Sequence, residues 1–156
     1  NIWSNAGAGL SYNLVATALA IAPVTPSTLF AAIDGGGVFK STDGGAHWTV
    51  ANTGIPSDLR LTTLTIDPAH PATVYLGTYW HGIYKSLDGG ATWSPANAGY
   101  DTTWITALIV DPQTPATVYA GTYNKGVLKS LDGGSTWSAV NSGLPCSLTG
   151  SVWVLQ

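Results

Sequence analysis

One eight-residue motif occurs three times in this chain of 156 residues, and it constrains the fold more than any other feature. Its pattern is Ser-x-Asp-x-Gly-x-x-Trp, and its copies are Ser41–Trp48, Ser86–Trp93 and Ser130–Trp137. The copies are 45 and then 44 residues apart (43 to 88, 88 to 132). Self-similarity at a fixed period indicates a fold that stacks copies of one supersecondary unit.

Each repeat predicts four short strands. In the second repeat, an apolar first strand at Leu64–Ile66 is followed by an Asp-Pro turn and by a second strand that contains Val74 and Tyr75. The third strand is expected at 82–85, and the motif forms the turn into a fourth strand that starts at its Trp. A period of about 40 to 50 residues with four strands per unit is typical of β-propeller blades. The predicted fold class is therefore all-β, with first strands that are buried apolar runs at Leu19–Ile21, Leu64–Ile66 and Leu108–Val110.

The chain is expected to form a single propeller segment over residues 1–156, with three full blades of four antiparallel strands at 15–51, 61–96 and 105–140. Residues 1–7 are interpreted as the outer strand of a preceding blade, and 148–156 as the first strand of a further blade. A closed propeller needs about four to eight blades, so three cannot close. Two interpretations stay open. Further blades of a longer chain complete the ring, or several copies of this chain complete one another.

The motif residues are interpreted as structural. A short Asp side chain accepts hydrogen bonds inside its own turn, Gly supplies positive φ, and Trp buries a large ring. A calcium loop would need more oxygen ligands at alternating positions, so no metal is expected there. The structural set is Ser41, Asp43, Gly45, Trp48, Ser86, Asp88, Gly90, Trp93, Ser130, Asp132, Gly134 and Trp137.

The motif resembles the Asp-box, or bacterial neuraminidase repeat, and the copies with their flanks cover nearly the whole chain. Families with this repeat include sialidases, xyloglucan-degrading hydrolases built from paired propellers, sortilin-type receptors, propeller lectins and photosystem II assembly factors. The chain is more loosely similar to the xyloglucan-hydrolase-type and photosystem-assembly-factor-type propellers. The resemblance implies a β-propeller fold and does not choose among these functions.

Composition excludes several function classes. Charged residues make up 8% of the chain, the net charge is −3, and the basic residues are four Lys and one Arg, so no nucleic-acid partner is expected. The longest apolar runs are far shorter than the roughly 20 residues that span a bilayer. Low charge with abundant Thr, Gly and aromatic residues favours an extracellular or secreted protein.

Cysteine and histidine usage argues against cofactors and metals. The lone Cys146 excludes an internal disulfide framework and a Cys-based metal cluster, and it is expected to be a free, partly buried residue. His47, His70 and His81 lie in three different turns, at no spacing that suits a metal site. We therefore expect neither a metal nor a cofactor.

The candidate binding residues lie in the loops between second and third strands and between repeats. The repeats agree closely elsewhere and diverge in these loops, which carry aromatic and polar side chains. Aromatic rings stack on the C–H faces of sugars, while Asp, Asn and Lys bind hydroxyl groups, so the favoured ligand is a glycan or glycoprotein. The alternative is that these are ordinary surface loops whose aromatic side chains pack on their neighbours. The candidates are Tyr79, Trp80, His81, Tyr123, Asn124, Lys125, Tyr100, Asp101, Trp104, Asp58 and Arg60.

Catalysis has one candidate, Asp34. The segment Ile33–Phe39 resembles a Thr-Asp-x-Gly-Gly-x-Tyr segment that carries a catalytic acid in xyloglucan hydrolases, where a second propeller supplies the partner acid. A glycosidase needs two carboxyl groups at one bond, and sialidases use an arginine triad with Tyr and Glu, whereas this chain has one Arg and no Glu. The sequence thus predicts a non-catalytic binding or scaffold module. The alternatives are a fragment of a xyloglucan-type hydrolase with Asp34 catalytic, and a natural or engineered self-assembling repeat.

Overall fold

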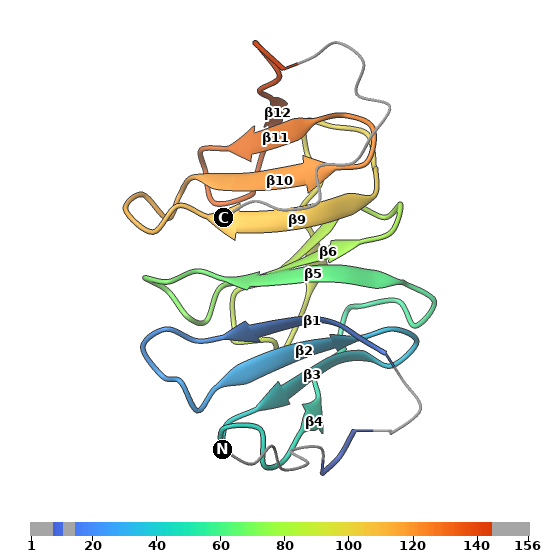
Figure 1. Cartoon of the computed structure of the whole chain (residues 1–156), viewed down its shortest axis with the longest axis vertical. Helices are drawn as coiled ribbons and strands as arrows, with labels where there is room; N and C mark the ends of the chain where they lie inside the picture. The colour runs from blue at the N-terminus through green and yellow to red at the C-terminus, as the bar shows by residue number, and fades with distance from the viewer. Residues whose placement is uncertain (1–7, 11–14, 145–156) are drawn as a thin grey trace.

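The computed structural model describes residues 8–10 and 15–144. These residues form three four-stranded antiparallel sheets, each a simple meander in chain order (Figure 1). Sheet 1 contains β1 (Ala16–Ile21), β2 (Leu29–Ile33), β3 (Gly37–Ser41) and β4 (Thr49–Val50). Sheet 2 contains β5 (Leu61–Ile66), β6 (Val74–Thr78), β7 (Ile83–Ser86) and β8 (Ser94–Pro95). Sheet 3 contains β9 (Ile105–Val110), β10 (Val118–Thr122), β11 (Val127–Ser130) and β12 (Ser138–Ala139).

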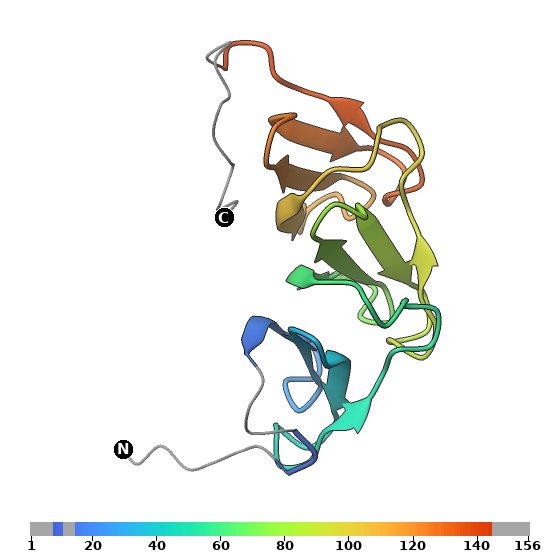
Figure 2. The same cartoon turned by 90° about the vertical axis from the view of Figure 1, so that its right-hand side faces the viewer.

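The sheets stack face to face and fan out into an arc (Figure 2). The first strands β1, β5 and β9 lie along the inner side of the arc and contact one another in order. The short fourth strands lie on the outer side. This is the arrangement of β-propeller blades in a ring that has not closed, and it confirms the predicted fold class. The part of the chain that the structure describes contains no helix able to cross a membrane.

The strands agree with the predicted order and differ in their limits. Each first strand begins three residues before its predicted apolar run, and each fourth strand begins one residue after its Trp. The strands predicted at 1–7 and 148–156 lie outside the described residues, as does Cys146.

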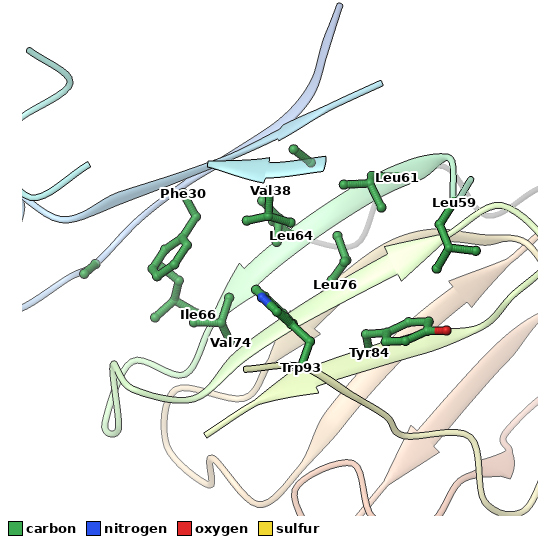
Figure 3. Close-up of a cluster of buried hydrophobic side chains, with 12 residues drawn as sticks. Phe30, Val38, Leu59, Leu61, Leu64, Ile66, Val74, Leu76, Tyr84 and Trp93 are labelled. Atoms are coloured by element: carbon green, nitrogen blue, oxygen red, sulfur yellow. The ribbon is translucent and has the colours of Figure 1, made fainter. Parts of the chain in front are cut away.

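The two largest clusters of the core lie between neighbouring sheets. Between sheets 1 and 2, Phe30 and Val38 pack against a cluster that includes Leu64, Leu76 and Trp93 (Figure 3). An equivalent cluster joins sheets 2 and 3. Burying each large apolar side chain contributes about 1.5–3 kcal/mol, so the stability of this fold depends on its sheet-to-sheet contacts.

A lysine on the third strand of sheet 1 and of sheet 2 links that sheet to the next. The Nζ atom of Lys40 donates to the Gly89 carbonyl at 2.7 Å, and that of Lys85 donates to the Gly133 carbonyl at 2.6 Å. The Tyr75 hydroxyl also donates to Gly133, at 2.9 Å. Burial raises the pKa of Tyr75 to about 12, and it lowers that of Lys85. Both acceptors belong to motif turns, so these turns also hold neighbouring sheets together.

The motif turns satisfy their own carboxylates. One Asp88 oxygen accepts from the backbone N–H of Thr92 and from the Ser86 hydroxyl, both at 2.8 Å, and the other accepts from the Thr92 hydroxyl at 2.6 Å. Hydrogen bonds of this kind favour the ionised form and lower the pKa of Asp88 to about 2. Asp43 and Asp132 have pKa values lowered to about 2 in the same way, with His47 and Thr136 as their main partners.

The turns that follow β4 and β8 each hold the motif Trp of the next sheet. The Trp93 backbone N–H donates to Thr53, and its indole N–H donates to Ala51, both at 2.9 Å. Gly54, at φ 91°, lies so close to the Trp93 carbonyl that a Cβ would overlap it. The same contact recurs between Gly99 and Trp137, and between Gly9 and Trp48. For Trp48, the partner that accepts its backbone N–H is the Ala8 carbonyl, at 2.9 Å.

One prediction about the core is wrong. The first strand of sheet 1 was expected to be buried, yet Leu19 is 65% exposed and Ile21 is 54% exposed. Their equivalents in sheet 2, Leu64 and Ile66, are 7% exposed. The difference arises because sheet 1 covers that face of sheet 2, whereas no described sheet covers the corresponding face of sheet 1.

Candidate functional site

A hollow of about 600 Å³ lies on the inner side of the arc, at the end of the strands opposite the motif turns. The loops between second and third strands and the connections between sheets meet at this end, which is the end predicted to bind a ligand. The hollow is lined by all three sheets, through Thr17, Asp34, Arg60, Leu61, Thr62, Tyr79, Trp104 and Thr106. Its volume is within the usual range for small-molecule sites.

Backbone hydrogen bonds hold each loop at the inner edge. In every sheet, the first residue of the loop after the second strand donates its N–H to the residue that precedes the first strand. Paired side chains therefore stand side by side at the start of each inner strand. The pairs are Asp34 with Val15 (2.9 Å), Tyr79 with Arg60 (2.9 Å) and Tyr123 with Trp104 (3.0 Å).

Four aromatic side chains from sheets 2 and 3 contact one another there. The rings of Trp104 and Tyr123 are stacked, with centroids 5.2 Å apart at 19°. Tyr79 meets Trp104 edge-on at 4.9 Å. Trp80 meets Tyr79 at 5.8 Å and Tyr123 at 5.9 Å, also edge-on. We call Tyr79, Trp80, Trp104 and Tyr123 the aromatic rim.

A charged pair continues the rim toward sheet 1. The Arg60 guanidinium lies 5.2 Å from the centroid of the Tyr79 ring, and its Nη2 is 3.5 Å from Oδ2 of Asp34. The two side chains are 66% and 34% exposed. An ion pair this long and this exposed is weak, so both groups can exchange partners with a ligand.

Three threonines in the hollow were not predicted as site residues. Thr17, Thr62 and Thr106 occupy the second position of β1, β5 and β9, and each is skipped by the register of its strand pair, as in a β-bulge. The three lie at the start of the inner strands and line the hollow. The sequence does mark these positions, because in all three repeats a Thr stands two residues before the Leu that the first strands share.

Trp80 has an unusual backbone conformation. At φ 66°, it is the one non-glycine residue with positive φ among those the structure describes, and Gly35 has φ 71° in the equivalent loop of sheet 1. A bulky residue in this region is strained, and such strain clusters at ligand-contacting positions. The Trp80 ring is 40% exposed and lies against the rings of Tyr79 and Tyr123.

Other predicted residues lie beside the hollow rather than in its lining. The His81 imidazole Nδ1 is 3.0 Å from the carbonyl oxygen of Tyr79, next to the rim. The Asn124 side chain accepts from the Thr103 hydroxyl at 2.9 Å, so it supports the loop of sheet 3.

Four further candidates are placed away from the rim. Tyr100, Asp101 and Lys125 line a second hollow of about 450 Å³, where the Lys125 Nζ is 3.0 Å from Asp101. Tyr100 packs its ring on Trp137, and burial raises its pKa. Asp58 interacts electrostatically with Tyr84, whose pKa is raised by burial and then by this carboxylate. The predicted set thus divides into an inner group around the rim and an outer group.

The inner edge carries side chains of several chemical kinds. It offers flat aromatic faces, one guanidinium, hydroxyl groups, and one carboxylate, Asp34, among the lining residues. No group of three His, Cys, Asp or Glu side chains suited to a metal ion occurs within residues 8–10 and 15–144.

Comparison with known proteins shows similarity at the level of structure. No protein-family model matches the sequence, and no curated protein matches it. A GH74 enzyme from Niastella koreensis superposes with a TM-score of 0.65 and 26% identity, over 80% of this chain and 22% of that one. An ancestral GH74 enzyme gives a TM-score of 0.70 and 21% identity, over 85% and 19%. YCF48 from Cyanidioschyzon merolae gives 0.65 and 16%, over 83% and 38%, and another YCF48 structure is bound to D1 peptide.

These neighbours are β-propeller proteins, and the chain shares their fold. It spans about a fifth of the length of the GH74 structures.

Proposed function

We propose that this chain is a non-catalytic β-propeller binding module that recognises a carbohydrate or the glycan of a glycoprotein. The observation that carries the proposal is the aromatic rim beside a hollow of about 600 Å³. The rim presents rings in several orientations on a rigid scaffold, which suits C–H-rich sugar faces.

Polar groups around the rim complement this surface. Asp34 accepts hydrogen bonds and Arg60 donates them. The hydroxyls of Thr17 and Thr62 donate to backbone carbonyls and can accept from a ligand. A neutral, hydroxyl-rich ligand needs this mixture of donors and acceptors. The composition, low in charge and rich in Thr, Gly and aromatic residues, supports an extracellular location for such a module.

The test is a calorimetric titration with xyloglucan oligosaccharides, using the chain and its Trp104→Ala variant. We expect saturable binding that weakens about tenfold in the variant, the equivalent of about 1.4 kcal/mol. Leu87→Ala is the matched control, because Leu87 is 69% exposed and lies at the motif end. A glycan affinity unaffected by Trp104→Ala would contradict the proposal. So would binding of D1 peptide, the ligand in the YCF48 structure, without any glycan binding.

A second candidate, part of a GH74-type hydrolase, is favoured by the 26% identity to the Niastella koreensis enzyme and by Asp34 in the hollow. Glycoside hydrolysis needs two carboxyl groups at one bond, and Asp34 is the sole carboxylate that lines the hollow among the described residues. Cleavage of xyloglucan by the chain, and its loss in Asp34→Asn, would establish this candidate. The binding proposal expects no cleavage and a modest change in affinity.

We also propose that the three motif turns are Asp-boxes. Their support is the shared pattern of Ser-to-Asp and backbone-to-Asp hydrogen bonds in all three copies.

A further inference from the structure

Sheet 3 carries the same lysine and tyrosine pair that joins sheet 2 to sheet 3, but no described sheet lies beyond it to accept their hydrogen bonds. Lys129 lies over the Tyr119 ring at 5.3 Å, as Lys85 lies over Tyr75 at 5.5 Å. The Lys85 and Tyr75 side chains both donate to the Gly133 carbonyl of the next sheet. Within the described residues, neither Lys129 Nζ nor the Tyr119 hydroxyl has a corresponding acceptor.

Two further features of sheet 3 also lack the packing partner that their equivalents have. Tyr119 and Val127 are partly exposed, whereas their equivalents in sheet 2, Tyr75 and Ile83, are buried at 1% and 0% exposure. A Cβ added at Gly143 would meet no described atom within 4 Å, although one added at Gly54 or Gly99 would overlap the motif Trp of the next sheet. The face is thus shaped for another motif-bearing sheet.

Sheet 1 presents the complementary surface at the other end of the arc. Gly44 is the equivalent of Gly133, and within the described residues nothing comes within 4 Å of the position a Cβ would take there. At Gly133, the Lys85 Nζ is 3.6 Å from that position. Leu19 and Ile21 are the exposed equivalents of residues that sheet-to-sheet packing buries.

We infer that a second copy of this chain docks head to tail on sheet 3. In this complex, Lys129 and Tyr119 of one copy donate to the Gly44 carbonyl of the other, and Leu19 and Ile21 are buried against Tyr119 and Val127. The contact repeats, residue for residue, the contact that joins sheet 2 to sheet 3. The occupant is identified by this match, because the chain's own sheet 1 carries both the free carbonyl turn and the exposed apolar residues.

The N-terminal turn must be exchanged for this contact to form. Ala8, Gly9 and Leu10 hold Trp48, the place that Ser142, Gly143 and Leu144 of the second copy would take. Both segments contain a Gly-Leu pair, so the incoming turn reproduces the contact that it displaces.

Two identical contacts of this kind close a ring. Two copies of a three-sheet chain give six sheets, within the range of about four to eight for closed propellers. A head-to-tail contact that closes by rotation forms a ring rather than a filament. The two hollows would then face one central channel, and a ligand would meet Asp34, Arg60 and the aromatic rim from both copies.

The experiment is sedimentation velocity of the full chain at several concentrations, with two variants. We expect the unaltered chain to sediment as a dimer and Leu19→Lys as a monomer, because the contact would bury the new charge. Leu19 is 65% exposed in the folded single copy, so the same charge should not prevent folding. Leu87→Lys, at a residue 69% exposed in the motif turn after β7, is the matched control and should remain dimeric. A monomeric unaltered chain overturns the inference, as does a Leu19→Lys variant that still dimerises.

A mixing experiment tests the head-to-tail arrangement. Lys129→Glu alters the opposite face, so each variant alone should be monomeric. A mixture of Leu19→Lys with Lys129→Glu retains one intact contact and should give a heterodimer. A Lys129→Glu variant that dimerises by itself would show that two like faces pair, which overturns the arrangement. Circular dichroism of each variant establishes that it is folded, and none of these results depends on glycan binding.

Discussion

The two ends of the sheets differ in how their side chains are used. At the motif end, the three turns repeat almost the same hydrogen bonds, and each carboxylate is satisfied inside its own turn. At the rim end, the three loops differ in sequence, and their side chains contact one another across sheets. We infer from this difference that the residues at the motif end specify the fold, so the loop sequences at the rim end can vary without changing it.

The largest expected effect is at the motif end. Replacing Trp93, which is 5% exposed, with Ala removes a ring from the core between sheets 1 and 2 and leaves a cavity. We expect the free energy of unfolding to fall by about 3–5 kcal/mol, measured by urea denaturation followed by circular dichroism. Small domains have about 5–15 kcal/mol in total, so this is a large share. A loss below about 1 kcal/mol would show that the motif Trp does not define the core.

At Trp80, on the rim end, a Gly substitution should destabilise the fold less than an Ala substitution. Gly tolerates the left-handed backbone at this position, whereas Ala retains the strain and loses the ring. We therefore expect Trp80→Gly to be more stable than Trp80→Ala by about 1 kcal/mol, compared by thermal denaturation. In ordinary strands and helices the order is the reverse. Both variants should lose affinity for the xyloglucan oligosaccharides, and an Ala variant more stable than the Gly variant would argue against backbone strain.

The motif carboxylates predict how stability depends on pH. The folded-state pKa values of Asp43, Asp88 and Asp132 are about 2, below the ordinary value of 3.8. A lowered pKa in the folded state means that these groups stabilise the fold above about pH 4, and that this contribution is lost as the pH falls toward 2. Urea midpoints measured across this window should decline. Thr92→Val removes the main donor to Asp88 and should flatten the decline, whereas an unchanged profile would contradict the assignment.

The smallest expected effect concerns one link between sheets 2 and 3. Tyr75→Phe removes a hydroxyl donor from the Gly133 carbonyl, which still accepts from Lys85 at 2.6 Å. We expect a loss of about 0.5–1 kcal/mol in the free energy of unfolding, since a net hydrogen bond contributes that much. Tyr119→Phe is the control, measured at low concentration, and should leave the stability of the single copy unchanged. Equal losses in both variants would contradict the link.

The fold was predictable because its instructions are local. In the first motif, Ser41 forms hydrogen bonds with Asp43 and Gly45 inside one turn, and these bonds need no residue from elsewhere in the chain. The motif Trp stands at the same position after this turn in every sheet. The exposure of Leu19 and Ile21 was not predictable in this way. It depends on which sheets cover sheet 1, whereas the apolar pattern of the strand is the same in all three repeats.

The candidate site was predicted in part, because loop membership does not determine which way a side chain lies. Tyr79 and Trp104 line the hollow of about 600 Å³. Tyr100 and Asp101 lie in the same loop between sheets 2 and 3 as Trp104, yet they line the second hollow. Thr62 lies within an apolar strand and was passed over, because the irregular register that places it at the hollow emerges from strand pairing. Contacts between rings of different sheets likewise require the packed structure.

The links between sheets have a consequence for how the chain opens. The two largest core clusters and the hydrogen bonds of Lys40 and Lys85 each join one sheet to its immediate neighbour, so the fold behaves as a one-dimensional array of nearest-neighbour couplings. Sheet 2 is coupled on both sides, and the outer sheets of a single copy on one. Amide hydrogens of β6 should therefore exchange with solvent more slowly than those of β2 and β10. A partner that covers the ends would slow exchange there most, because it would stop the array from fraying.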